Sequence, residues 1–133
     1  MLMAVESQTD SMFAGNRHIL RWAGILDADG SGILDLTGRI VKFALTRKSS
    51  AGNPALTPIL DFSSADVSPQ VTIPNPVLGS PHVEVLLKPV DTATLAPKET
   101  VYYCELEVYE AGNTDPVVVA TIDLTIKPNV VNT

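Results

Sequence analysis

The stretch that decides the fold is VYYCELEVYEAGNTDPVVVATIDLTIKP, residues 101–128. In each half, mainly apolar residues alternate with mainly polar ones at period two, which is typical of a half-buried β-strand. The segment GNTDP between the halves is a turn sequence, so the two strands are predicted to form a hairpin. The inward sets are Tyr102, Cys104, Leu106 and Val108 in the first strand and Ala120, Ile122, Leu124 and Ile126 in the second; the outward sets are Tyr103, Glu105, Glu107 and Tyr109, and Thr121, Asp123 and Thr125.

The same pattern recurs upstream. Strands are predicted within residues 17–26, 39–47 and 82–90, and shorter apolar pieces at 59–62 and 71–73 lie among prolines, as edge strands or irregular connections do. A turn-rich segment between the first two predicts that they pair antiparallel. The inward sets are Val41, Phe43 and Leu45, and Val83, Val85 and Leu87; the outward sets are Lys42, Ala44 and Thr46, and His82, Glu84 and Lys88.

The one helical signal is DTATLAP, residues 91–97, with Asp91 as its cap and Pro97 as its stop. Short strands with turns between them and no longer helix predict an all-β chain. The expected fold is a two-layer antiparallel β-sandwich of about six to eight strands with one short helical turn.

A chain of 133 residues is long enough for one domain with one core. Residues 1–16 show no sustained period and are expected to be a flexible N-terminal arm, before a sandwich domain at 17–130 and a C-terminal tail at 131–133. Met12 and Phe13 would give the arm apolar anchors for an interface. The arm is either a frayed terminus or a strand donated to a neighbour's sheet edge.

Composition argues against several classes of protein. The net charge of −6 disfavours nucleic acid as a partner, and no apolar run approaches the roughly 18 residues that span a bilayer. The start lacks the basic leader and apolar core of a signal peptide. Cys104 is the single cysteine, so no intrachain disulfide forms, which is compatible with a reducing cytoplasm. Residues 17–48 carry a net +3 against −9 elsewhere, which suits either head-to-tail contacts between copies or ordinary solvated strands.

The stretch LDADGSGILDLTG, residues 26–38, resembles a calcium loop with its strongest ligand missing. Its candidate ligands alternate as in an EF-hand, but the twelfth position, which should supply a bidentate glutamate, is Gly38. Strand-like flanks replace the two helices of that motif, so a turn is expected and cofactors are not. The weak candidate metal ligands are Asp27, Asp29, Ser31 and Asp35.

No catalytic constellation is visible in the sequence. His18 and His82 are far apart and lack metal-ligand spacing, and neither a G-x-S-x-G elbow nor a glycine-rich phosphate loop occurs. The chain is therefore not expected to be an enzyme. Trp22 and Cys104 are expected in the core. Tyr103 and Tyr109 fall on the outward set and are interface candidates.

The order of the motifs resembles the N-terminal domain of tailed-phage baseplate upper proteins and related small tail-associated proteins. The matching elements are an Asp/Gly turn with Asp35-Leu36-Thr37-Gly38, then Asp91-Thr92 and Leu95, then a Tyr-Tyr strand with Glu105-Leu106-Glu107, and a closing Lys127-Pro128. The resemblance spans roughly residues 17–130. Lys98-Glu99 replaces a glycine that the family often has before the Tyr strand.

The resemblance implies an immunoglobulin-like β-sandwich and a structural role in a virion. The expected function is an adaptor or connector in the tail or baseplate region, assembled in the host cytoplasm. Its expected partners are other tail, baseplate or fibre proteins and further copies of itself, with no membrane or nucleic acid. The alternatives are a carbohydrate-binding or adhesion module and a capsid decoration protein of similar fold.

Overall fold

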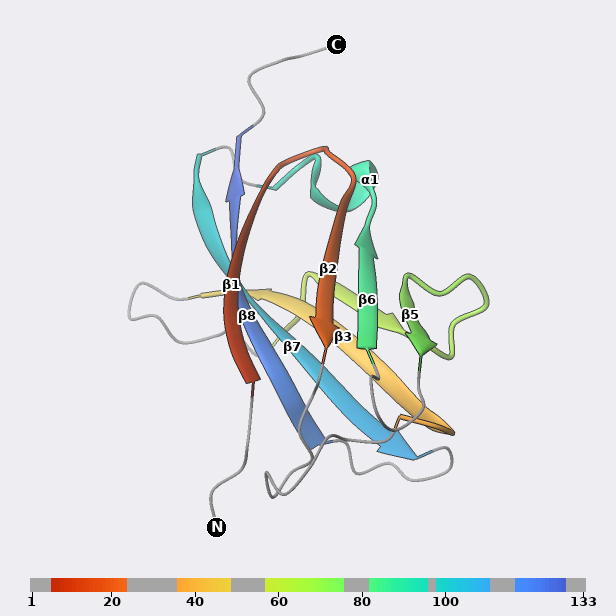
Figure 1. Cartoon of the computed structure of the whole chain (residues 1–133). Helices are drawn as coiled ribbons and strands as arrows, with labels where there is room; N and C mark the ends of the chain where they lie inside the picture. Colours follow the sequence, from red (N-terminus) through yellow and green to blue (C-terminus); the bar gives the residue numbers. More distant parts are fainter. Residues whose placement is uncertain are drawn as a thin grey trace.

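The computed structural model describes residues 6–23, 36–48, 57–75, 82–95, 98–110 and 117–128. Within these residues two sheets pack face to face as a sandwich, so the predicted all-β fold is confirmed (Figure 1). The helix α1 (Pro89–Thr92) is a single turn. The strands are β1 (Glu6–Phe13), β2 (His18–Ala23), β3 (Arg39–Arg47), β4 (Leu60–Ser63), β5 (Val71–Asn75), β6 (His82–Leu87), β7 (Thr100–Glu110) and β8 (Val117–Lys127).

The larger sheet has the order β1-β8-β7-β3-β4. Its centre is the predicted antiparallel pair of β7 and β8, in which Cys104 lies opposite Ile122. The register shifts between Leu106 and Glu107, and the predicted turn at residues 112–116 lies outside the described residues. The strand β3 pairs antiparallel with both β7 and β4. The alternation in the opening stretch therefore defines the centre of this sheet.

The smaller sheet has the order β2-β6-β5, and its composition corrects one prediction. The strands β2 and β3 do not pair with each other: β2 pairs with β6, whereas β3 lies in the other sheet. Each strand has a strongly apolar inner face, and the two faces meet across the core. The rings of Trp22 on β2 and Phe43 on β3 have centroids 6.4 Å apart. The short pieces predicted as edge strands, β4 and β5, do lie at sheet edges.

The strand order is that of an immunoglobulin-like sandwich. One sheet contains the counterparts of the C, F and G strands as β3, β7 and β8, and the other contains those of B, E and D as β2, β6 and β5. Tyr102 stands two residues before Cys104 on β7, which is the spacing of the tyrosine corner in that fold, and both side chains are buried. The chain has a single cysteine, so it cannot form the inter-sheet disulfide found in antibody domains. Side-chain packing occupies that place in the core.

The core confirms the predicted inward sets. Phe43 lies at its centre, tilted against Trp22 and stacked on Phe62 at 6.0 Å between centroids. Thr46, which was expected to face outward, is buried, and its hydroxyl donates to the Thr57 carbonyl at 3.2 Å. The other fully buried large side chains are Leu20, Leu36, Leu45, Leu87, Leu106, Ile122, Leu124, Ile126 and Val41.

The N-terminus corrects a second prediction. Residues 6–13, expected to belong to a flexible arm outside the domain, form β1, which runs parallel to β8 at the edge of the larger sheet. Gly15, with a φ of +79°, then turns the chain into β2 of the smaller sheet. Met12 near the end of β1 and Ala14 directly after it are buried and anchor this strand to the core. Because most residues of β1 are polar, the strand leaves no sustained apolar period in the sequence.

The turn α1 joins three parts of the sandwich. Asp91 lies at the third helical position and not at the cap: its carboxylate accepts the Lys88 backbone N–H at 2.7 Å and the Gln70 amide at 2.8 Å. The next residue, Thr92, is buried, and its hydroxyl accepts the Gly15 N–H at 2.9 Å. The prediction placed the helix cap at Asp91, three residues too late, because Lys88 is the cap and Pro89 already begins the helix. Pro97, the predicted stop, lies outside the described residues.

Candidate functional site

The outer face of the larger sheet is the candidate contact surface. It is formed by side chains that point away from the core on β7 and on its neighbours β3 and β8, as the strand registers show. These positions are partly exposed, with polar, charged and aromatic side chains interspersed. This outer face consists of Ile40, Lys42 and Ala44 on β3, Val101, Tyr103, Glu105, Glu107 and Tyr109 on β7, and Thr121, Asp123 and Thr125 on β8.

Tyr103 is a predicted interface residue, and it lies toward the start of β7, between β3 and β8. Its hydroxyl donates to Glu105 Oε1 at 2.8 Å, two residues along the same strand. Burial raises the pKa of the Tyr103 phenol, and the adjacent Glu105 carboxylate raises it further. The phenol is therefore a fixed neutral donor at physiological pH. Its ring and its bond to Glu105 suit a protein or ligand contact rather than proton transfer.

Tyr103 and Tyr109 have different neighbours on the adjacent strands. Lys48, just after β3, reaches across β7 to β8, where its Nζ lies 2.8 Å from Asp123 Oδ1. Asp123 is itself opposite Tyr103 in the β7–β8 register. Tyr109, the second predicted tyrosine, is half-buried opposite Ile40 at the other end of β7. The outer face thus has an aromatic residue toward each end, with charged side chains between them.

The structure separates the two predicted N-terminal contacts. Met12 is 5% exposed and packs into the core of its own domain, so its assignment as an interface residue is wrong. Phe13 is 48% exposed, and Lys127 Nζ lies 5.9 Å from its ring centroid. They differ because neighbouring residues of a strand point to opposite faces. Phe13 therefore remains available for contact.

The candidate calcium loop is described only at its end. The four candidate ligands Asp27, Asp29, Ser31 and Asp35 lie outside the described residues. Leu36 is buried, and its carbonyl accepts the Arg39 N–H at 3.1 Å, which closes a turn directly before β3. Gly38 occupies this turn with a φ of +73°, a backbone conformation that glycine adopts without strain. The position that would hold the bidentate ligand in an EF-hand is here a turn glycine.

The histidines lie in separate carboxylate pairs. His18 Nε2 lies 2.8 Å from Asp10 Oδ2, and His82 Nε2 lies 3.9 Å from Glu84 Oε2. Within the described part of the chain, no group of three or more His, Cys, Asp or Glu side chains is placed to hold a metal ion. The contact between Asp10 and His18 was missed at the sequence level, since it depends on β1 and β2 lying on either side of one corner.

Cys104 and Trp22 belong to the core, as predicted. Both are fully buried, and burial strongly raises the pKa of the Cys104 thiol, so it is not a ready nucleophile at neutral pH. The Trp22 indole N–H has no hydrogen-bond partner among the described residues. These side chains hold the sheets together and do not form a site.

Two comparisons of the chain with known proteins found no match. No protein-family model matches it, and no curated protein matches it in sequence. None of the helices in the described ranges is long and apolar enough to cross a membrane.

Proposed function

We propose that this protein is a structural subunit of a tailed-bacteriophage virion, an adaptor or connector in the tail or baseplate region. It works through protein–protein contacts with other tail, baseplate or fibre components and with copies of itself. It is assembled in the host cytoplasm and resides in the virion. The support is the ordered set of motifs that resembles the N-terminal domain of baseplate upper proteins.

The motif Asp91-Thr92 is the observation that carries this proposal. In the fold it links the approach to β5, the end of β6 and the turn between β1 and β2, through hydrogen bonds of 2.7 to 2.9 Å. Leu95, the next motif residue, is buried beside them. A motif whose members all stabilise a rigid frame fits a protein that acts as a building block.

The outer face supports the same proposal. Tyrosine side chains contribute strongly to protein interfaces because the ring buries a large area with few rotatable bonds. Tyr103 is already held by Glu105, so its ordering costs little further entropy on contact. Aromatic anchors surrounded by charged side chains are typical of an interface core with a polar rim.

Labelling of purified virions tests the proposal. Gold-labelled antibody against this chain is expected to bind at the tail or baseplate in negative-stain images, and mass spectrometry of the particles is expected to detect the chain. Labelling on the capsid shell would support the decoration protein instead. Absence of the chain from purified particles would contradict a virion role altogether.

Mutation of the outer face tests the contact surface itself. Tyr109→Ala is expected to lower incorporation into particles while the circular dichroism spectrum stays unchanged, because the side chain is half-buried on the outer face. Thr72→Ala, at an exposed position of the smaller sheet, is the matched control. A glycan array with and without chelator distinguishes the adhesion alternative: glycan binding lost in Tyr109→Ala would favour that alternative over assembly.

A further inference from the structure

Among the residues that the structure describes, the two sheets end in four edge strands, and β1 differs from the other three. Edge strands present unpaired backbone groups that can pair with another chain, and proteins discourage this with short strands, prolines, irregularities or charges. The strand β4 has four residues, β5 contains Pro74 and a register shift, and β2 displays Arg21 beside Glu84. The strand β1 has eight residues without proline, lysine or arginine, and its register with β8 is regular.

The direction of the backbone groups on β1 follows from its turn into β2. The Ala14 N–H donates to the Lys127 carbonyl at 2.8 Å and so continues the ladder with β8. Because these groups alternate along a strand, even-numbered residues of β1 face β8 and odd-numbered residues face away from the sheet. The Phe13 carbonyl, on the outer edge, accepts the Asn16 N–H at 3.2 Å. The remaining outward-facing residues of β1 are Ser7, Thr9 and Ser11.

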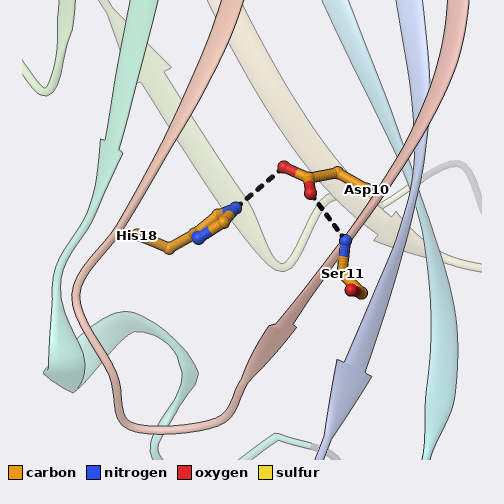
Figure 2. Close-up of polar contacts among 3 residues, drawn as sticks. All are labelled: Asp10, Ser11 and His18. Atoms are coloured by element: carbon orange, nitrogen blue, oxygen red, sulfur yellow. Dashed lines mark hydrogen bonds and ion pairs between the residues drawn. The ribbon is translucent and has the colours of Figure 1, made fainter.

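A single carboxylate closes the middle of this edge. Asp10 Oδ1 accepts the outward N–H of Ser11 at 2.8 Å, while Asp10 Oδ2 lies 2.8 Å from His18 Nε2 on β2 (Figure 2). A carboxylate only accepts hydrogen bonds, so the histidine nitrogen donates. Asp10 thus occupies an edge amide and also ties the edges of the two sheets together.

We propose that Asp10 and His18 form a latch that keeps the β1 edge closed to a second copy of this chain. When the latch opens, two β1 strands pair antiparallel about a two-fold axis at Thr9, and the larger sheets of the two copies join. In this process the Ser7 carbonyl of the second copy takes the Ser11 N–H in place of the Asp10 carboxylate.

The register of this pairing follows from the alternation and from charge. Centring the axis on Thr9 sets Thr9 opposite its equivalent and Ser7 opposite Ser11, so all three outward-facing residues pair at once. It also sets Asp10 opposite Gln8. An axis centred on Asp10 would place two carboxylates opposite each other, which is unfavourable. A two-fold contact of this kind is the commonest symmetry of protein oligomers. The inference stands whether or not the chain is a virion subunit.

The test compares two substitutions of the same residue by light scattering after size-exclusion chromatography. Asp10→Ala removes the latch and is expected to move from monomer to twice the monomer mass as protein concentration rises. Asp10→Asn removes the same charge but keeps an oxygen for the Ser11 N–H, and its amide N–H can donate to Nε2 of a neutral His18. It is therefore expected to stay monomeric like the unmodified chain. This pair separates the effect of the latch from the effect of reduced charge repulsion.

A proline identifies the surface that pairs. Thr9→Pro removes an N–H that faces away from β8, so the β1–β8 ladder is retained, and its addition to Asp10→Ala is expected to restore the monomer. Hydrogen exchange gives a second readout: the Ser11 amide should exchange fast in monomeric Asp10→Ala and slowly in its dimer. If Asp10→Ala lost the fold, His18→Ala weakens the same latch from β2 and should dimerise at higher concentration.

Three outcomes would overturn the inference. These are an Asp10→Ala chain, or its His18→Ala substitute, that remains monomeric at every concentration; a dimer that persists after Thr9→Pro; and an Asp10→Asn chain that dimerises as readily as Asp10→Ala.

Discussion

Tyr103 and Cys104 are neighbours on β7 and show how one strand creates two environments. Tyr103 points to the outer face and Cys104 into the core, yet burial raises the pKa of both groups. For Tyr103 the Glu105 carboxylate adds to the effect, because a phenolate beside a negative charge is unfavourable. Both groups therefore keep their protons in the folded chain at pH values where an unfolded chain loses them.

This difference predicts that the protein loses stability in alkaline solution. Ordinary pKa values are about 8.5 for cysteine and about 10 for tyrosine. Above these values the unfolded chain binds fewer protons than the folded chain, so the free energy of unfolding falls as pH rises, and the stabilisation is complete only below them. Tyr103→Phe is expected to flatten the decline above about pH 10. Urea unfolding followed by tryptophan fluorescence at stepped pH measures it; an unchanged slope would contradict the assigned environment of Tyr103.

Cys104 also predicts a reactivity pattern. The thiol is fully buried, so a thiol reagent reaches it only when the strand opens. Labelling by Ellman's reagent at pH 8 is expected to be slower in the native chain than in urea by a factor on the order of 10³ or more, given usual domain stabilities. Fast labelling of the native chain would mean that β7 opens locally. Because the chain has one cysteine, the signal has a single source.

At the scale of elements, the sequence predicted where the strands lie better than which strands pair with each other. Period-two alternation identified β3, β6, β7 and β8, and prolines marked the two edge strands β4 and β5. The pairing of β2 was mispredicted because a turn-rich connection suggests a hairpin, whereas here the chain passes from one sheet to the other. The strand β1 was missed because its mostly polar sequence shows no apolar alternation, although Met12 and the following Ala14 are buried.

The turn α1 gives a prediction at this scale. Thr92→Val removes the hydroxyl that accepts the Gly15 N–H and leaves that partly buried donor without a partner. The expected cost is about 1–3 kcal/mol of unfolding free energy, since an unsatisfied buried donor loses its solvation. Thr94→Val, at an exposed position two residues later, is the matched control and should change stability little. Equal effects of both substitutions in thermal or urea unfolding would show that the contact with the β1–β2 turn contributes nothing.

At the scale of the whole molecule, composition and periodicity were enough for the sandwich but not for the sites. The class follows from apolar faces that must be buried in pairs, and the alternation in β3, β6, β7 and β8 shows such faces in the sequence. The outward positions of Tyr103 and Tyr109 followed from the same alternation. Asp10 and His18 lie on consecutive strands of different sheets, and Lys48 and Asp123 lie far apart in the sequence, so only the packed structure reveals these two contacts.

The aromatic stack at the centre leads to a prediction about the whole fold. Phe43 contacts Trp22 of the opposite sheet and Phe62 of its own, so it connects both layers. Phe43→Ala would leave a cavity in the middle of the sandwich, and truncation of a buried phenylalanine costs about 3–5 kcal/mol. That is a large part of the roughly 5–15 kcal/mol that stabilises a domain, and no disulfide holds the two sheets together.

Phe13→Ala is the matched control, because it makes the same chemical change at a half-exposed position on β1. Its expected cost is about 0.5–1 kcal/mol or less, from the contact with the Lys127 ammonium. Differential scanning calorimetry of both variants measures the contrast: Phe43→Ala should lose or greatly lower the unfolding transition, whereas Phe13→Ala should keep it close to that of the unmodified chain. Similar transitions in the two variants would mean that the sheets do not depend on the stack, and that the small sheet is held instead through α1 and the corner at Gly15.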